Sequence, residues 1–369
     1  MRFAADENNT KITGRTIYRD GVRYLGYTGS SVSFRFKGKT AKVELVSDAS
    51  THEKRDYAWV AVFVKEEKDN EISYGAAADE EPYKRFCLDK DEAEYVLYES
   101  DEEKTVTVTL IKYSEAEYAA CGIKWIETDS EEILTPPAAK KLKIEMVGDS
   151  ITCGYGNEGG VEETQHDTSK ENPMGAYLLL TATHLDADVN VVAWNGKGVI
   201  TAYIGEDAPK VKDADWLVPM LYEYTDAGCE RDYLHTPEDK WEKWDNSNFI
   251  PDIITVYLGT NDASYTDNDA ARNEEFVNGY TKFLGTIRSK NPEIPILCML
   301  GTMDKRLCGS VERAVELFNS KNNTDNVYYL ELPFQDEADG LSINWHPTVK
   351  THRKTAEIVE KKIIEILKK

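Results

Sequence analysis

Hydrophobic and polar positions alternate with a period of two along the first third of the chain. The segment "SVSFRFKG" at 31–38 places Val32, Phe34 and Phe36 on one face of an extended backbone. Clusters of Gly, Asp and Lys, which are typical of turns, separate further segments of the same kind. These segments lie at 41–45, 56–64, 94–100, 104–113, 111–118 and 122–129. The pattern predicts an antiparallel β-sandwich.

The pattern changes after the segment "ETDSEEILTPPAAKK" at 127–141. This segment is acidic, then contains Pro-Pro, then becomes small and basic, which is typical of a connection between domains. A chain of 369 residues is also long for a single hydrophobic core. We therefore predict two domains, at 1–130 and 131–369.

Apolar runs without alternation dominate the second part of the chain. Such runs are typical of parallel strands that are buried on both faces. They are predicted at 142–148, 188–194, 253–258, 294–300 and 326–332. Helical spacing is found between them at 175–185 and 269–289, and in a last helix with Pro347 in its first turn. This alternation predicts a doubly wound parallel sheet.

The residues that follow the strands of a parallel sheet form its ligand-binding edge. Here they are "GDSIT" at 148–152, "NGKGV" at 195–199 and "GTNDAS" at 259–264, together with "NWHP" at 344–347 before the last helix. These four segments are where we search for the functional residues.

Ser150 is the candidate nucleophile, because it follows a strand and enters a helix whose unpaired N–H groups face incoming negative charge. A helix-capping serine is the alternative. A hydroxyl needs a base, and the chain has six histidines. His52 lies in the predicted sandwich, His352 lies one turn into the last helix, and three others lie away from strand ends, so His346 is the candidate base. A buried structural histidine is its alternative.

Backbone and amide donors for a developing oxyanion are available at two other strand ends. Gly198 offers a backbone N–H with no side chain in the way, Gly196 is its alternative, and Asn261 offers a side-chain amide. Asn261 could instead hold its own loop together. Asp149 and Asp262 are predicted to stabilise turns.

The segments "VGDSIT", "NGKG", "GTND" and "WHP" together resemble the four conserved blocks of the SGNH/GDSL hydrolases, a superfamily with a flavodoxin-like sheet. The resemblance implies roles for Ser150, Gly198, Asn261 and His346. With a preceding β-sandwich, "PMLYEYT" and "FIPDIITVYLGTND", nearly the whole chain resembles carbohydrate esterase family 2. That family joins a jelly-roll-like domain to an SGNH domain and removes acetyl groups from plant-wall polysaccharides.

The family resemblance implies a serine esterase that acts on acetylated xylan or mannan oligosaccharides through an acetyl-enzyme. Ser150 would attack the carbonyl, His346 would take its proton, and Ser150 N–H, Gly198 and Asn261 would bind the oxyanion. No metal or organic cofactor is called for. The alternatives are another SGNH O-acetylesterase, a lipase-type esterase, or a carbohydrate-binding protein whose SGNH site has decayed.

The sequence leaves several candidates for the group that orients His346. Ile343 stands where a D-x-x-H pattern would have its aspartate. Asn344, a backbone carbonyl and Asp339 are the candidates, in that order, because Nδ1–H requires only an acceptor. Trp345 is a candidate sugar platform or a core residue, and Tyr155 and Trp194 are further candidates for which a core position is favoured. The polar loops 157–172 and 263–269 favour a small acyl group.

Charge and composition restrict the classes of partner that the protein is expected to bind. The formal charge of −23, from 44 Lys and Arg against 67 Asp and Glu, disfavours nucleic acid and anionic membranes. The six cysteines are scattered and predict buried free thiols. The start "MRFAADENNTK" lacks an apolar stretch, so the chain as given is expected in the cytoplasm, whereas a trimmed leader would imply secretion. The oligomeric state is not indicated.

Overall fold

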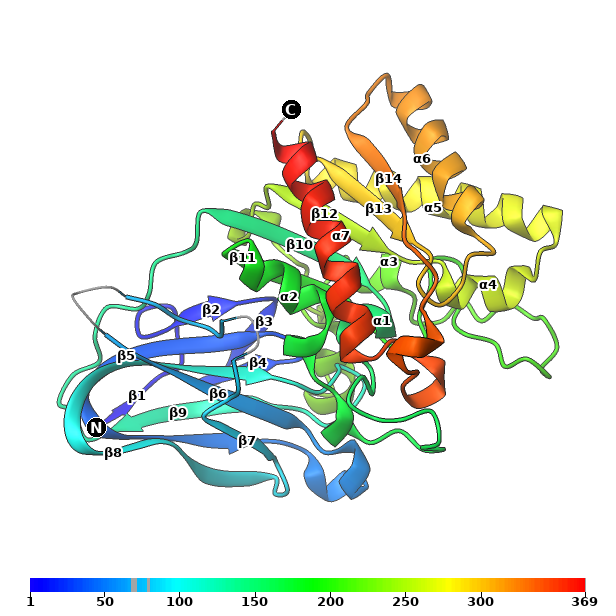
Figure 1. Cartoon of the computed structure of the whole chain (residues 1–369). Helices are drawn as coiled ribbons and strands as arrows, with labels where there is room; N and C mark the ends of the chain where they lie inside the picture. The colour runs from blue at the N-terminus through cyan, green and yellow to red at the C-terminus, as the bar shows by residue number, and fades with distance from the viewer. Residues whose placement is uncertain (68–71, 78–79, 369) are drawn as a thin grey trace.

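The N-terminal sheet of the computed structural model is antiparallel and curls over its own core (Figure 1). The structure describes residues 1–67, 72–77 and 80–368. Neighbouring strands follow the order β3-β4-β9-β5-β8-β6-β7, with β1 on β9 and β2 on β5. The strands are β1 Arg2–Phe3, β2 Lys11–Thr13, β3 Thr16–Arg19, β4 Val22–Leu25, β5 Ser31–Val46, β6 Trp59–Glu66, β7 Lys84–Cys87, β8 Glu92–Lys112 and β9 Gly122–Thr128. The predicted sandwich-like domain is confirmed.

Two strands of this sheet are longer than the sequence pattern predicts. The predicted pair 31–38 and 41–45 is the single strand β5, and 94–100 and 104–112 form the single strand β8. The ladder between them shifts register on either side of Thr40. A bulge of this kind bends a strand without ending it, which curls the sheet. The polar residues predicted as turns therefore mark bends.

The predicted strand 111–118 is wrong beyond its second residue. Only Ile111 and Lys112 belong to β8, and the chain then forms a loop as far as β9. The buried ammonium of Lys112 donates to the carbonyls of Gly26 at 2.7 Å and Glu115 at 2.8 Å. Glu115 is itself buried, and its carboxylate accepts the backbone N–H of Asn195 at 3.1 Å. This loop leaves the sheet because it packs against the second domain.

The C-terminal sheet has five parallel strands, as predicted. They are β10 Leu142–Gly148, β11 Ala187–Ala193, β12 Ile253–Tyr257, β13 Ile296–Leu300 and β14 Val327–Glu331. Their order is β11-β10-β12-β13-β14, which is that of a flavodoxin-like sheet. After β10 the chain forms β11 on one side of it and then β12 on the other side. The carboxyl ends of β10 and β12 therefore border the point where a ligand crevice forms.

Helices cover both faces of this sheet (Figure 1). Helix α2 packs with α7 on one face, and α5 packs with α6 on the other. Thr348 caps α7 by accepting the Thr351 N–H, so Pro347 precedes the helix and does not lie in its first turn. The helices are α1 Ser150–Cys153, α2 Tyr177–His184, α3 Val218–Leu221, α4 Thr260–Thr266, α5 Ala270–Lys290, α6 Cys308–Asn322 and α7 Val349–Leu367. Single 3₁₀ or π turns lie at Ala49–Thr51, Lys54–Asp56, Thr168–Lys170, Pro173–Gly175, Cys229–Tyr233, Glu238–Lys240, Asn246–Asn248, Glu337–Asp339 and Ile343–Trp345.

The two sheets share a buried interface. Tyr27, Phe63 and Tyr113 of the antiparallel sheet region belong to the same apolar cluster as the parallel sheet. Arg15 reaches across this interface to Glu145 of β10 at 3.1 Å, and both side chains are buried. Removing one partner of such a pair leaves an uncompensated charge, so the pair fixes how the two parts fit together.

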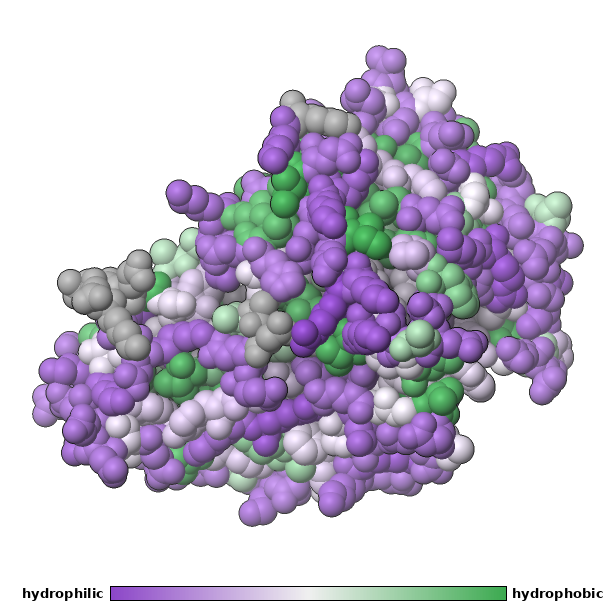
Figure 2. Space-filling view, viewed as in Figure 1, coloured by the Kyte–Doolittle hydropathy of each residue, from purple (hydrophilic) through white to green (hydrophobic). Residues whose placement is uncertain are grey.

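Hydrophilic side chains cover most of the face that carries α7, and apolar side chains form only small separate patches there (Figure 2). Among the residues that the structure describes, no helix is both long and apolar enough to cross a membrane.

Candidate active site

Ser150 and His346 meet at the carboxyl edge of the parallel sheet. Ser150 is the first residue of α1, directly after β10, and His346 lies just before α7. The Nε2 atom of His346 is 2.9 Å from Ser150 Oγ, which is hydrogen-bonding distance. Ser150 is 5% exposed and opens onto a cavity. The predicted nucleophile and base are therefore brought together, although 196 positions separate them.

A backbone carbonyl lies at the other nitrogen of His346. Nδ1 is 3.0 Å from the carbonyl oxygen of Ile343. Asn344 and Trp345 both have left-handed backbones, with φ of 51° and 60°, and this turn folds the Ile343 carbonyl back toward the ring. Ile343 itself is fully buried. Where a carboxylate could stand, the chain has an apolar packing residue.

The two side chains proposed to orient His346 lie elsewhere. The Asn344 amide donates to the hydroxyl of Tyr155 at 3.1 Å. Asp339 forms ion pairs with Lys350, at 2.8 Å, and with Lys354, and these lysines hold its pKa below the ordinary value. The order given from the sequence is thus corrected: the backbone carbonyl comes first. Burial lowers the pKa of His346 to about 4, against the smaller raising effect of the backbone acceptors, so the ring is neutral at physiological pH.

Two of the predicted oxyanion donors, the Ser150 N–H and the Asn261 amide, belong to residues that line the same cavity. The Ser150 N–H is the first of α1 and has no acceptor within that helix. The Asn261 amide nitrogen contacts the Lys197 carbonyl at 3.1 Å and Asp149 at 3.3 Å. Asp149 also accepts the Ile151 N–H at 3.0 Å, which is the turn-stabilising role predicted for it. Asn261 reaches the site from the end of β12, as the sequence predicted.

The glycine assignment changes from Gly198 to Gly196. The Gly198 N–H already donates to the Thr201 carbonyl at 3.1 Å, and Gly198 does not line the cavity, whereas Gly196 does. A Cβ at position 198 would lie 2.4 Å from an oxygen of Asp262. That carboxylate accepts the backbone N–H groups of 199, 200 and 201. Gly198 therefore makes room for the predicted turn-stabilising aspartate.

The cavity above Ser150 has a volume of about 580 Å³ and a mixed lining. Two aromatic side chains are open to solvent at its rim: Trp345 is 64% exposed and Tyr203 is 57% exposed. Trp194 is only 2% exposed and packs edge-on against Trp216, so it is a core residue and not a substrate contact. The charged residues of the lining are Glu206, Asp304 and Arg306.

Tyr155 lines the same cavity but is 6% exposed. Its ring centroid is 4.4 Å from that of His346 and 4.2 Å from that of His166. The sequence interpretation placed His166 away from the strand ends, and it missed Tyr203 altogether. Both lie in long loops, where no periodic pattern exists. The cue for Tyr203 was its position in the loop that follows β11.

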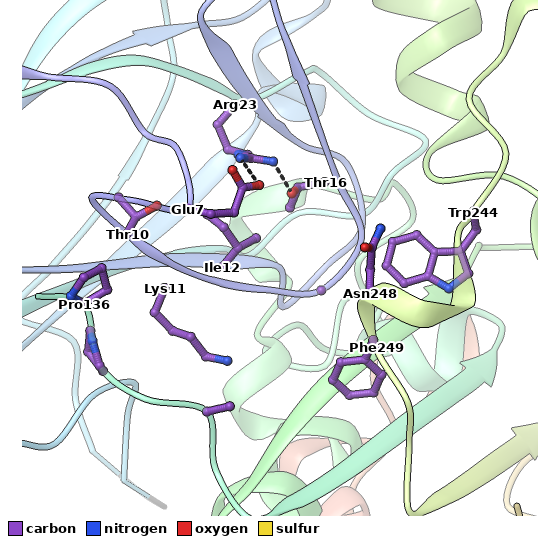
Figure 3. A pocket seen from close by; sticks show the side chains of 13 residues that line it. Glu7, Thr10, Lys11, Ile12, Thr16, Arg23, Pro136, Trp244, Asn248 and Phe249 are labelled. Atoms are coloured by element: carbon purple, nitrogen blue, oxygen red, sulfur yellow. Dashed lines mark hydrogen bonds and ion pairs between the residues drawn. The ribbon is translucent and has the colours of Figure 1, made fainter.

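A second cavity of about 660 Å³ lies at the opposite edge of the parallel sheet, where β10 and β12 begin (Figure 3). We call it the N-edge cavity. Its lining includes Glu7, Lys11, Arg23, Trp244 and Asn248. Within the described part of the chain, no group of three or more His, Cys, Asp or Glu side chains is arranged to hold a metal ion.

Comparisons with known families agree with both halves of this architecture. Residues 146–354 match the model of the GDSL-like lipase/acylhydrolase family. Residues 12–137 match the model of the carbohydrate esterase 2 N-terminal domain. The second of these matches ends in the connection between the sheets, and the first begins within β10.

Curated relatives cover nearly the whole chain. The cellulase/esterase CelE of Acetivibrio thermocellus is 28% identical over 95% of this chain, and the chain spans 39% of the length of that relative. An acetylxylan esterase/glucomannan deacetylase of Cellvibrio japonicus is 26% identical, with 99% of this chain and 91% of the relative covered.

Solved structures show the same fold. A family two carbohydrate esterase from Clostridium thermocellum, in complex with cellohexaose, is 27% identical and has a TM-score of 0.79, with 97% of this chain and 99% of that chain covered. An acetyl xylan esterase from the rumen bacterium Butyrivibrio proteoclasticus has a TM-score of 0.82 at 21% identity, over 98% of this chain and 97% of that chain.

Proposed function

Because the chain belongs to the GDSL-like lipase/acylhydrolase family, we propose that it is a serine esterase that removes O-acetyl groups from acetylated hemicellulose oligosaccharides derived from xylan or mannan. The observation that carries the proposal is the 2.9 Å contact between Ser150 Oγ and His346 Nε2 at the floor of an open cavity. The relatives named for acetylxylan and glucomannan deacetylation support the substrate class.

In the first half of the reaction, the acetyl group moves from the sugar to Ser150. Neutral His346 takes the hydroxyl proton at Nε2 while Oγ attacks the acetyl carbonyl carbon. The tetrahedral intermediate then collapses, and the C–O bond to the sugar breaks. His346 returns the proton to the departing sugar oxygen. The products are the free sugar hydroxyl and an acetyl ester on Ser150.

Three donors are placed to stabilise the oxyanion of the tetrahedral intermediate. These are the backbone N–H groups of Ser150 and Gly196 and the side-chain amide of Asn261, which would exchange its longer contact, that of 3.3 Å with Asp149, for the oxyanion. The first belongs to the start of α1, where the helix dipole also favours negative charge. Donors that are already in position stabilise the transition state without reorganising.

Water completes the cycle. It loses a proton to His346 Nε2 and adds to the acetyl carbonyl, and the same donors hold the second oxyanion. Collapse of this intermediate breaks the bond to Ser150 Oγ, which regains its proton from His346. Acetate leaves, and the serine and the neutral histidine are restored.

The cavity supports a sugar-bound acetyl group over a long acyl chain. Tyr203 and Trp345 present flat apolar surfaces beside Ser150, and aromatic faces of this kind suit pyranose rings. Polar and charged side chains such as Asn195, Glu206 and Asp304 share the lining, which would make burial of a long alkyl chain costly. We therefore expect acetyl esters to be hydrolysed much faster than octanoyl esters.

The test is incubation with acetylated xylan and acetylated mannan oligosaccharides, followed by mass spectrometry for stepwise loss of acetyl groups. Ser150→Ala serves as the matched control, because it changes only the hydroxyl. Loss of acetyl groups with the native protein and not with the variant supports the proposal. Deacetylation that persists in Ser150→Ala, or sugar binding without any acetyl loss in the native protein, would overturn it.

A further inference from the structure

Four aromatic rings from three separate segments form a continuous column that ends on His346. Tyr118 stacks on His166 with ring centroids 4.8 Å apart, His166 stacks on Tyr155 at 4.2 Å, and Tyr155 contacts His346 at 4.4 Å. The first two pairs are nearly parallel, with interplanar angles of 16° and 19°. We call this set the ring column.

The distal end of the ring column is built by the antiparallel sheet domain. Tyr118 lies in the loop between β8 and β9 that packs against the second domain. Arg85 of β7 donates to the carbonyls of Ser169 at 2.7 Å and Glu171 at 2.8 Å. These contacts anchor the end of the loop that carries His166.

Glu171 lies beside His166 at the edge of the column. Its carboxylate oxygen lies 2.9 Å from His166 Nε2, and the side chains of the two residues are 0% and 10% exposed. Its other oxygen accepts the backbone N–H of Glu115 at 2.8 Å. Glu171 therefore connects the loop of His166, to which it belongs, to the loop of Tyr118.

His346 needs such support because its own hydrogen bonding is sparse. A triad carboxylate would hold the imidazole in the required orientation and tautomer. Here Nδ1 faces neutral backbone acceptors, with the Ile343 carbonyl at 3.0 Å and that of Asn344 beside it. Hydrogen bonds at the two ring nitrogens fix the axis that joins them but leave the ring plane free to tilt about that axis. The face of Tyr155, which lies against the ring, restricts that tilt.

We propose that His166 and Tyr118 are positioning residues, which hold Tyr155 against His346 so that Nε2 stays directed at Ser150. The antiparallel sheet domain is then part of the catalytic apparatus, because it supplies the end of the ring column. This inference rests on the proposed esterase function, since it assigns the support of the base in that reaction.

A purely electrostatic role for His166 is the competing explanation. A positive charge on His166 would disfavour a second one on His346, and the carboxylates of Glu171 and Glu117 would oppose this effect. The two explanations differ in what must be retained at position 166. Stacking requires a flat ring, whereas the electrostatic role requires a group that can carry a proton.

The experiment compares His166→Phe with His166→Leu. Both variants lose the contact with Glu171, so their difference isolates the flat ring. We expect kcat on p-nitrophenyl acetate to fall about tenfold in His166→Leu and about twofold in His166→Phe, with KM unchanged in both, given the size of aromatic pair interactions. Tyr118→Leu and Tyr118→Phe should repeat the pattern at smaller amplitude. His184→Leu, which removes a histidine–glutamate pair at Glu360 outside the column, is the matched control and should retain native kcat.

Proton–nitrogen NMR of the histidine rings supplies a readout that does not depend on turnover. In the native protein and in His166→Phe, the His346 ring should show one tautomer, with the proton on Nδ1, and signals shifted by the Tyr155 ring. In His166→Leu these signals should broaden and lose that shift. Thermal unfolding midpoints of both variants verify that each is folded.

Native kcat values in both variants, with unchanged His346 signals, would overturn the positioning role. A Phe variant as impaired as the Leu variant would assign the effect to charge instead. Failure of the native protein to hydrolyse any acetyl ester would refute the proposed function separately, and the NMR comparison would still decide whether the column orients His346.

Discussion

Two cavities of similar volume lie at opposite edges of the parallel sheet, and they differ in how their polar groups are satisfied. In the active-site cavity, at about 580 Å³, the Ser150 hydroxyl contacts the neutral His346 ring, and the Asn261 amide contacts the Lys197 carbonyl and Asp149. The N-edge cavity, at about 660 Å³, is slightly larger. Its charged groups are already neutralised: Lys11 pairs with Asp188 at 2.8 Å, and Arg23 pairs with Glu7 at 2.5 Å (Figure 3).

This difference shows that volume alone does not identify a reactive site. Catalysis requires a nucleophile, a base and oxyanion donors that converge on one point, and parallel strands deliver such groups at their carboxyl ends. At the opposite edge of the sheet, the charged groups stabilise the contact between the two sheets. There, Arg15 lies between Glu145 and the ring of Trp244, with the guanidinium 4.7 Å from the ring centroid. The following changes test this division of roles.

The largest effect is expected from His346→Gln. Loss of the base should lower kcat/KM for acetyl ester hydrolysis by at least about 10⁴-fold, because an unassisted serine hydroxyl is a poor nucleophile. The matched change at the other cavity is Glu7→Gln, which should leave kcat/KM within about twofold, since exposed ion pairs contribute little. Initial rates of acetate release measure both. A comparable loss in Glu7→Gln would contradict the distinction between the cavities.

Among changes near the N-edge cavity, Arg15→Met should have the largest effect, and the effect should be on the stability of the fold. Leaving Glu145 buried without its partner is expected to lower the free energy of unfolding by about 3–5 kcal/mol. Urea denaturation followed by tryptophan fluorescence measures the loss. The folded variant should keep nearly native kcat, because no part of the active site is altered; a variant of native stability would show that the pair contributes little.

Asn261→Ala and Asn248→Ala remove the same kind of side chain from the two cavities. Loss of one oxyanion donor should lower kcat by about 10²- to 10³-fold with little change in KM. Asn248→Ala, which removes an amide from the lining of the N-edge cavity, should leave kcat unchanged. Steady-state kinetics on one acetyl ester measures kcat and KM for both variants. Equal effects at both positions would remove Asn261 from the oxyanion site.

The pH profile should reflect the burial of His346. Its pKa is lowered to about 4, so the ring stays in the neutral, basic form above that value and becomes protonated below it. The value of kcat/KM should therefore be level from neutral pH down to about 5 and fall about tenfold per pH unit well below 4. Rates measured after brief exposure, with return to neutral pH as a control, separate this titration from acid unfolding. Burial also raises the pKa of Asp149 to about 7 and that of Asp262 to about 6, so a midpoint near 6.5 that persists in Asp149→Asn and Asp262→Asn would mean that burial does not control the ring.

The smallest effect is expected from Asn344→Asp. The amide of this residue contacts Tyr155 and not His346, so a carboxylate there should change kcat by about twofold or less. Determination of kcat and of the acid limb of the pH profile tests this. A large gain in rate, together with an upward shift of the limb, would show that the side chain reaches Nδ1 after all.

Much of the fold and the central pair of the site followed from local sequence patterns. The apolar runs predicted all five parallel strands, because burial on both faces removes alternation. The turn residues after three strands and before the last helix predicted where Ser150, Asn261 and His346 would meet. These features depend on neighbours a few positions away, which a pattern along the chain can detect.

The details that decide the chemistry depend on contacts between distant segments. Gly198 and Gly196 both fit the local sequence. They differ because the Gly198 N–H donates to the Thr201 carbonyl, in a turn whose N–H groups at 199–201 are held by Asp262 of a distant segment. The acceptor for His346 follows from two left-handed residues and from the burial of Ile343. Neither is visible in composition or spacing.

The sequence by itself determined two sheets of different kind, the edge at which the site lies, and the identity of nucleophile and base. Periodicity and turn chemistry encode these, because they are properties of short segments. Only the tertiary structure decided that a backbone carbonyl serves His346, that Trp345 and Tyr203 are open while Trp194 is buried, and that Tyr118 and His166 stack behind the base. The physical reason is that a hydrogen bond or a ring contact requires two groups at a few ångströms, and the fold, not the local sequence, sets that distance.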